Sequence, residues 1–457
     1  MAQSRTDDGL SGRAARAGGM TRRDFIRVSG AGLAGAALLG SGTLAGCGGG
    51  GGEGGSGSIT FAWGPEETGT LQKMIDKFNR ENKDGITVKY REMPADTGQY
   101  FDQLRTQFQA GGGGIDVVGG DVIWPAQFAA QGYYLDLSDR FSEDSRAEFL
   151  AAPMEANTFE DKPYGVPWYT DSGMLYYRKD LLEKSGFDEP PKTWNEMKEM
   201  AKKVRQDSGT KFGFVFQGSD YEGGVCNGLE YIWTHGGNVL DPEDPSKVIV
   251  DSPESVAGLT TQRSTVTDGT APQAVSNYTE QESQTTFLRG DAVFMRNWPY
   301  IYGLAANEEE SEVRQEQIGV SALPVGKEGD QTFSALGGWN FSINANSENP
   351  DAAWAFIQFM VDPEQQKTLA LKTARIPTRK SMLEDKEILD AVPVIALGKE
   401  AISRTRPRPV SPYYSDMSLK LADQFNASLK GETQPQQAVN TLDRELKEIV
   451  EQGESQS

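Results

Sequence analysis

Aromatic side chains stand next to hydrogen-bonding groups in three short segments of the chain. These segments are VPWYTD at 166–171, RNWPY at 296–300 and LGGWN at 336–340. The first is expected to be extended, so its tyrosine and aspartate point to the same side, and the proline of the second favours a loop. The groups we expect to contact a ligand are Tyr169, Asp171, Trp298, Tyr300, Gly338 and Trp339. Each ring, taken alone, could equally be packed in a hydrophobic core.

Carboxylates follow the ends of two expected strands. Glu66 and Glu67 come directly after the apolar stretch 59–63, and Asp121 follows the apolar stretch 115–119. Ligands of open α/β sheets bind at the carboxyl ends of the strands, which makes these acids candidate ligand groups. Two alternatives stay open, because an acidic pair also suits a helix N-terminus and Asp121 could be a helix N-cap.

A proline-rich segment at 404–414, RTRPRPVSPYY, carries three arginines. Proline restricts the backbone and could hold a guanidinium group in a defined position. We select Arg408 as the binding candidate, and the alternative is a solvated basic loop in an acidic protein.

The combined chemistry of these groups suits a neutral sugar. An aromatic face can pack against the C–H face of a pyranose ring, while carboxylates, amides and guanidinium groups hydrogen-bond with its hydroxyls. Hydrogen bonds to charged partners are the stronger ones. Three aromatic segments in one chain therefore favour a pocket in which a sugar ring stacks.

Alternating strands and helices must position these side chains. Hydrophobic periodicity predicts strands at 59–63, 86–90, 115–119, 212–216 and 341–344. It predicts helices at 71–78, 100–109, 124–130 and 435–452, one that begins with Thr193 and Glu196 as a capping box, and one that begins at Asn349 and Pro350. The order of these elements favours an α/β fold with two lobes and a mainly parallel sheet.

Composition excludes some classes of function. The 457 residues contain 45 Lys and Arg against 66 Asp and Glu, a net charge of −21, which disfavours a nucleic-acid partner. The chain has two cysteines and one histidine, too few for a zinc site of the usual kind. We expect no metal and no cofactor, and we interpret Cys226 as a free, buried thiol.

The N-terminus has the pattern of an export signal. A twin-arginine segment, TRRDFIR at 21–27, precedes a weakly apolar stretch at 30–46 that is too short and glycine-rich to span a bilayer. The sequence LAGC at 44–47 resembles the lipobox of bacterial lipoproteins, in which the cysteine is lipidated. We therefore expect a signal peptide at 1–46, a lipidated Cys47, and a flexible glycine-rich tether at 47–58. The alternative is an ordinary signal with a coincidental cysteine.

Taken in order along 59–450, several segments resemble the trehalose/maltose-binding proteins of the ABC-importer solute-binding class. The matching segments are 116–124, 166–171, 175–181, 217–223, 296–300, 336–339 and 408–414. The resemblance implies sugar contacts at Glu67, Asp121, Tyr169, Asp171, Trp298, Tyr300, Gly338, Trp339 and Arg408. Some members of the class carry an arginine where this chain has Tyr100 or Phe101, so one hydroxyl partner is missing or replaced.

The resemblance also implies a fold and a mode of action. The fold is the α/β, two-lobe fold of periplasmic binding proteins, with a ligand cleft between lobes that hinge crossovers join. Lobe 1 would comprise 59–168 and 326–373, and lobe 2 would comprise 169–325 and 374–457. The lobes would close on a disaccharide such as trehalose or maltose, without catalysis. A monomer, anchored to the outer face of the cell membrane, would pass it to the permease subunits of the importer.

Two other classes of function remain open from the sequence. An exported glycoside hydrolase could use carboxylates such as Glu67 and Asp121 as acid and base, whereas His235 is the only histidine for histidine-dependent catalysis. A binding protein for another solute, such as an oligopeptide, a polyamine or a glycerol-phosphate compound, is the second alternative.

Overall fold

The computed structural model describes residues 57–65, 68–94, 97–306 and 311–455. The predicted export signal, the lipidation site Cys47 and most of the tether lie outside the described residues, and so do Glu66 and Glu67. The described residues belong to one compact unit, 54–457. None of their helices is both long and apolar enough to cross a membrane.

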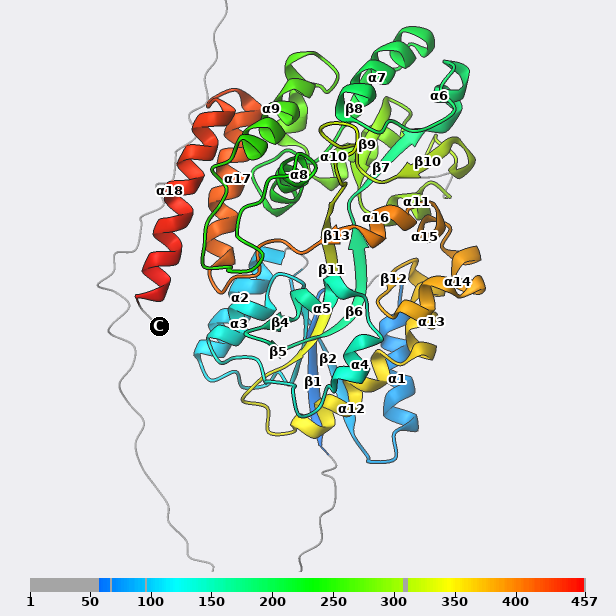
Figure 1. Ribbon diagram of the computed structural model, residues 1–457. Coiled ribbons are helices and arrows are strands. Elements are labelled where there is room, and N and C mark those ends of the chain that lie inside the picture. Colours follow the sequence, from blue (N-terminus) through cyan, green and yellow to red (C-terminus); the bar gives the residue numbers. More distant parts are fainter. Residues whose placement is uncertain (1–56, 66–67, 95–96, 307–310, 456–457) are drawn as a thin grey trace, which may run out of the picture. The chain divides into compact units, whose positions relative to one another are not determined.

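The first sheet lies in the lower half of Figure 1 and has the strand order β12-β6-β11-β3-β1-β2, with β13 beside β11. Its strands are β1 (Ser58–Trp63), β2 (Thr87–Glu92), β3 (Val117–Asp121), β6 (Val166–Ser172), β11 (Ser334–Ile343), β12 (Ile376–Pro377) and β13 (Thr405–Arg406). β1 runs parallel to β2 and β3, and β11 runs antiparallel to β3 and β6. The predicted parallel βαβαβ unit at the start of the body is confirmed, and β11 is longer than the predicted strand 341–344.

Helices flank this sheet, and all of them except the short α4, which buries no residue, pack against its core. They are α1 (Thr70–Glu81), α2 (Thr97–Gln109), α3 (Pro125–Ala130), α4 (Glu143–Ala147), α5 (Ala151–Ala156), α12 (Pro350–Met360) and α13 (Pro363–Thr373), with the hairpin β4 (Thr158–Phe159) and β5 (Lys162–Pro163) after α5. Helix α1 buries Leu71, Met74, Ile75 and Phe78, the face that the spacing of its apolar residues predicts.

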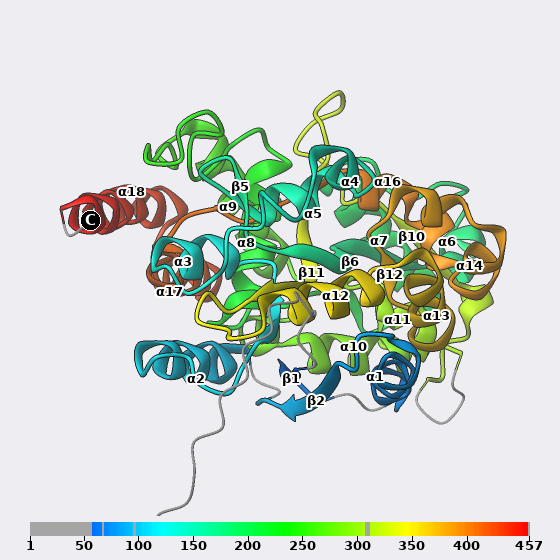
Figure 2. The same ribbon diagram turned by 90° about the horizontal axis from the view of Figure 1, so that it is seen from below.

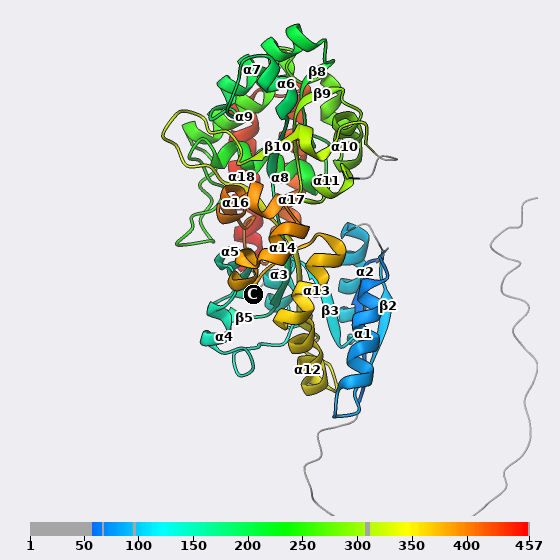
Figure 3. The ribbon, with the colours of Figure 1, turned by 90° about the vertical axis from the view of Figure 1, so that its right-hand side faces the viewer.

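The second sheet, in the upper part of Figures 1 and 3, has the strand order β10-β7-β9-β8. Its strands are β7 (Met174–Arg178), β8 (Phe212–Val215), β9 (Ala292–Asn297) and β10 (Ile318–Ser321). The helices before β10 are α6 (Lys179–Lys184), α7 (Trp194–Ser208), α8 (Glu222–Trp233), α9 (Pro253–Thr267), α10 (Glu280–Leu288) and α11 (Tyr300–Leu304). Thr193 caps α7 as predicted, but Glu196 accepts from the N–H of Lys192 rather than completing the capping box with Thr193.

The C-terminal segments return to the second sheet. They are α14 (Lys386–Ala391), α15 (Val394–Leu397), α16 (Lys399–Ser403), α17 (Tyr414–Lys430) and α18 (Pro435–Glu454). Helices α17 and α18 share a hydrophobic core with α8 and α9. Helix α18 buries Ala438, Leu442, Leu446 and Val450, as its amphipathic pattern predicts.

The chain first crosses between the two sheets at Gly173, between the end of β6 and the start of β7. A Cβ atom at this position would lie 2.0 Å from the Glu230 carboxylate and 2.5 Å from the Arg296 guanidinium. Glycine is required here because these two charged side chains pack directly against the backbone. The crossover therefore lies against a buried ion pair. The predicted division into lobes, with its first boundary at 168/169, stays a proposal, and residues 169–172 belong to β6 of the first sheet.

Candidate functional site

Strand β11 brings predicted site residues of three strands together. Trp339 pairs with Asp121 at the end of β3 on one side and with Tyr169 of β6 on the other. Gly337 pairs with Asp171. The register of the first sheet thus places four of the predicted positions, 121, 169, 171 and 339, next to one another.

Trp339 is half-buried and rests on a buried aromatic cluster. Its ring centroid is 5.9 Å from those of Trp63 and Trp124 and 6.2 Å from that of Tyr100, with which it is nearly parallel. The Tyr100 hydroxyl donates to two backbone carbonyls inside the core. Tyr100 therefore packs against the ring of Trp339. Its hydroxyl is bonded to the backbone and does not offer a partner to a ligand.

Two glycines of β11 allow a close approach, Gly338 to the neighbouring strand β6 and Gly337 to the second sheet. Gly338 has φ 118°, and a Cβ there would lie 2.3 Å from the carbonyl oxygen of Tyr169. A Cβ at Gly337 would lie 3.0 Å from Cβ of Asp171 and 3.2 Å from the indole of Trp298. Trp298 follows β9 of the second sheet, so this indole reaches across the sheet boundary to the strand that carries Trp339.

Charged groups hold the Trp298 indole in place. Its Nε1 donates to Oε1 of Glu280 at 3.3 Å, and the guanidinium of Arg296 lies 4.1 Å from the ring centroid. Arg296 is itself fully buried and donates to both carboxylate oxygens of Glu230, at 2.7 and 2.5 Å. Trp298 leaves β9 in a loop, as predicted, but its orientation is set by an ion pair that the sequence does not reveal.

Arg408 connects the two sheets through carboxylates. Its Nη2 donates to Oδ1 of Asp121 at 3.2 Å, and its Nη1 donates to Oε1 of Glu222, at the start of α8, at 2.7 Å. The residue is 6% exposed, which rules out the alternative of a solvated basic loop at this position. Burial raises the pKa of Asp121, and the guanidinium of Arg408 opposes that rise.

Asp121 is not a helix N-cap. Helix α3 starts after Trp124, whereas Oδ1 of Asp121 accepts from the N–H of Ile123 at 3.1 Å in the preceding turn. The same oxygen also accepts from Arg408. The side chain therefore combines a local turn contact with an ion pair between sheets.

Asp171 is the acid most affected by its surroundings. Burial raises its pKa to about 7, the positive charge of Arg375 opposes this rise, and Asp121 adds to it. Arg375, which follows α13, lies over two rings: its guanidinium carbon is 4.5 Å from the centroid of Tyr169 and 4.9 Å from that of Trp63. The site therefore contains a second acid and guanidinium group beside Asp121 and Arg408.

The remaining predicted residues have different positions. Tyr300 begins α11, is 39% exposed, and donates to Oε1 of Gln284 at 3.0 Å. Glu67 lies outside the described residues, so its predicted ligand contact stays a prediction. Cys226 is free and buried, as predicted.

Sequence reasoning missed several residues of the site, namely Trp63, Glu222, Glu230, Glu280 and Arg375. Glu222 and Glu280 each start a helix, a position where an acid has an ordinary structural explanation. Glu230 lies inside α8, and no local pattern marks Arg375. The signal that could have indicated Trp63 is its position at the end of the first strand, the same reasoning that selected Asp121.

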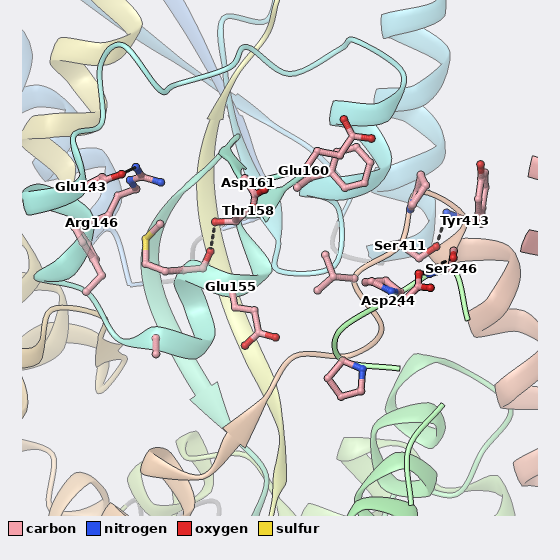
Figure 4. Close-up of a pocket in the computed structure, with 18 of the residues that line it drawn as sticks. Glu143, Arg146, Glu155, Thr158, Glu160, Asp161, Asp244, Ser246, Ser411 and Tyr413 are labelled. Carbon is pink, nitrogen blue, oxygen red and sulfur yellow. Dashed lines mark hydrogen bonds and ion pairs between the residues drawn. The ribbon is translucent and has the colours of Figure 1, made fainter. Parts of the chain in front are cut away.

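A separate pocket of about 970 Å³ lies among α4, α5, the β4–β5 hairpin and the segments 242–246 and 410–413. Figure 4 shows its carboxylates and Ser411 with Tyr413. None of the predicted ligand residues lines it. In Figure 2, α4 and α5 lie on the opposite side of β6 and β11 from α10 and α11, which carry Glu280 and Tyr300. Within the described ranges, no group of three or more His, Cys, Asp or Glu residues could hold a metal ion.

Comparison with known proteins agrees with this architecture. Residues 64–367 match the family model for bacterial extracellular solute-binding proteins. A protein of Deinococcus radiodurans named "Probable ABC transporter-binding protein" is 34% identical, over 81% of this chain and 88% of that protein. The maltose-bound MalE3 structure of T. maritima is 37% identical with a TM-score of 0.76, covering 86% of this chain and 99% of that chain.

A further solved structure, the GacH receptor of Streptomyces glaucescens, is 26% identical with a TM-score of 0.73 and covers 86% of this chain and 98% of that chain. These likenesses confirm the predicted two-lobe fold of periplasmic binding proteins. The family match covers more than half of the sequence. The chain therefore belongs to the bacterial extracellular solute-binding protein family.

Proposed function

We propose that the protein is the extracytoplasmic binding component of an ABC importer and that it binds a disaccharide such as maltose or trehalose. The observation that carries this proposal is the contact of Trp298, from the second sheet, with the β11 segment that bears Trp339. The indole of Trp298 thus approaches β11 at Gly337, and β11 pairs with Asp121 and Asp171. Aromatic faces flanked by carboxylates are the groups that a pyranose ring needs.

Lobe closure is the proposed mechanism. Trp298, Glu222 and Glu280 belong to elements around the second sheet, whereas Trp339, Asp121 and Asp171 belong to the first. A sugar that contacts both groups stabilises the closed arrangement of the lobes and shifts the population toward it. The permease would then recognise the closed form. The solute-binding family and the maltose-bound relative support a binding role rather than hydrolysis of the sugar.

The proposed location is the outer face of the bacterial cell membrane. An export signal at 1–46 and a lipidated Cys47 would place the body outside the cytoplasm on the glycine-rich tether 47–58. The partners would be the membrane-embedded permease subunits, and the carrier would be a monomer. Mass spectrometry of the membrane fraction, before and after Cys47→Ser, tests the anchor: an acylated N-terminal peptide should vanish in the variant.

A thermal-shift panel tests the ligand class. Ligand that binds the native state at about one hundred times Kd stabilises it by about 2.7 kcal/mol. We expect maltose or trehalose to raise Tm, and sucrose, glucose and phosphate esters to have smaller effects. A response to phosphate esters or polyamines alone would favour the other solute class, and release of product from a chromogenic α-glucoside would favour a hydrolase.

Three variants test the site. Trp298→Ala, Trp339→Ala and Asp121→Ala should abolish the sugar-dependent shift while the unliganded proteins remain folded. Trp354→Ala is the matched control, because Trp354 is half-buried on α12 and packs against the core of the first sheet. Unchanged affinity in all three site variants would remove this site assignment.

A further inference from the structure

We infer that Arg375 binds the sugar directly and, together with Asp171, holds two neighbouring hydroxyls of one neutral pyranose ring. This inference rests on the proposed function and deepens it. Arg375 forms no hydrogen bond or ion pair with the residues that the structure describes, and its Nη1 is buried without a partner. The guanidinium is held instead by the faces of Tyr169 and Trp63, at 4.5 and 4.9 Å.

The backbone register places Arg375 beside Asp171. In the antiparallel pairing of β12 with β6, Ile376 lies opposite Thr170 and Pro377 lies opposite Tyr169. Continuing this register by one residue brings Arg375 opposite Asp171. Side chains of directly opposed residues point to the same face of a sheet, and the two charges are close enough for Arg375 to affect Asp171 electrostatically.

The two buried arginines around the site differ from Arg375, which is half-buried. Arg296 is paired with Glu230, and Arg408 is paired with Asp121 and Glu222. Both terminal nitrogens of Arg408 donate to carboxylates, although its Nε is buried without a partner, and Arg296 donates to both carboxylate oxygens of Glu230. Because a buried donor without an acceptor is unfavourable, an arginine that is held by rings and has no carboxylate partner among the described residues is a donor available to a ligand.

The chemistry of the pair selects a neutral diol. Ionised Asp171 accepts from one hydroxyl, and the remaining N–H groups of Arg375 donate to the oxygen of its neighbour. The indole of Trp298 would lie 3.2 Å from a Cβ atom at Gly337, which pairs with Asp171, and it supplies a face on which the same ring can stack. A carboxylate or phosphate at this position would face the charge of Asp171, so an anionic sugar fits less well.

Isothermal titration calorimetry with maltose, or with trehalose if the wild type binds only trehalose, tests the inference. Arg375→Gln should weaken binding by about 10- to 100-fold, the effect of losing one charged hydrogen bond. Arg375→Lys keeps the positive charge but not the planar guanidinium group, so its affinity should fall less than that of Arg375→Gln. Lys372→Gln is the matched control, since it removes one positive charge from an exposed position three residues upstream, and its affinity should equal that of the wild type.

A monodeoxy series of the same sugar separates contact from a purely structural role. Removal of one particular hydroxyl should weaken binding to the wild type as much as Arg375→Gln does. The same deoxy sugar should bind the Arg375→Gln variant with the same affinity as the parent sugar. Equal affinity of the wild type and both Arg375 variants would overturn the inference while leaving the proposed function intact. A loss in the variants that is the same for every deoxy sugar would also overturn it, because Arg375 would then only support the rings. If the wild type binds no sugar at all, both proposals fall together.

Discussion

Replacement of Asp171 by Asn should change both the stability and the pH dependence of the protein. Burial raises the pKa of Asp171 from 3.8 to about 7 in the unliganded fold. The folded protein therefore holds a proton on this carboxyl at pH values where the unfolded chain has lost it. Its contribution to stability is fully present below about pH 4 and is lost as the pH rises to about 7.

The magnitude follows from the two pKa values. A difference of about 3 between them corresponds to about 4 kcal/mol of destabilisation at pH 8, at about 1.36 kcal/mol per pH unit. Asn cannot ionise, so Asp171→Asn should recover up to about 4 kcal/mol at pH 8 and almost nothing at pH 4. The difference in free energy of unfolding between wild type and variant, taken at each pH, reports on Asp171 alone, because the other titrating groups are the same in both proteins.

The affinity for sugar should increase as the pH rises, whereas the contribution of Asp171 to stability decreases. A hydroxyl that donates to the ionised carboxylate favours loss of the proton, so wild-type affinity should increase from about pH 5 to about pH 7 and then level off. The variant should bind more weakly at pH 8 and lack this rise. Calorimetry in two buffers of different ionisation enthalpy counts the protons released, and urea unfolding across the same pH range measures stability. Identical pH profiles for wild type and Asp171→Asn would refute this reasoning.

Three further predictions concern the surrounding scaffold. Arg408→Met leaves Asp121 and Glu222 without their shared cation and should lower the free energy of unfolding by about 3–5 kcal/mol in urea titrations. This deficit should shrink at acid pH, where Asp121 becomes protonated. Gly338→Ala, at φ 118°, should cost about 1–3 kcal/mol or more, because the added Cβ also meets a backbone carbonyl. Cys226 is buried, and burial raises its pKa to about 12, so a thiol reagent should label it only as the protein unfolds in urea.

The elements with strong periodicity were the ones that the sequence could predict. The apolar spacing in α1 and in α18 specifies one buried face over several turns, and both helices form as expected. Strand β11 shows the opposite case. Only 341–344 has a strand pattern, while its N-terminal half contains the Gly337–Gly338 pair, whose strand pairing comes from β6 and β3 on either side.

The same reasoning explains which site residues were missed. Trp298 and Trp339 were visible because tryptophan beside proline or glycine is conspicuous in a sequence. Arg375 and Glu222 have no such local signal. Arg375 approaches Asp171 only through the pairing of β12 with β6. Glu222 approaches Asp121 only through the packing of α8, where both acids bind Arg408. Contacts between segments so far apart in the chain depend on tertiary register, which local periodicity does not contain.

The buried ion pair of Glu230 and Arg296 contacts both the crossover at Gly173 and the indole of Trp298. Oε1 of Glu230 accepts from the N–H of Ala335, at the start of β11. A Cβ atom at Gly173 would collide with the same carboxylate. Its partner Arg296 lies under the indole of Trp298. Movement of the backbone at the crossover must therefore displace the groups that orient the indole. Since an isolated buried charge is strongly unfavourable, the pair moves as a unit, and opening of the lobes and withdrawal of the Trp298 ring from β11 are expected to be one event.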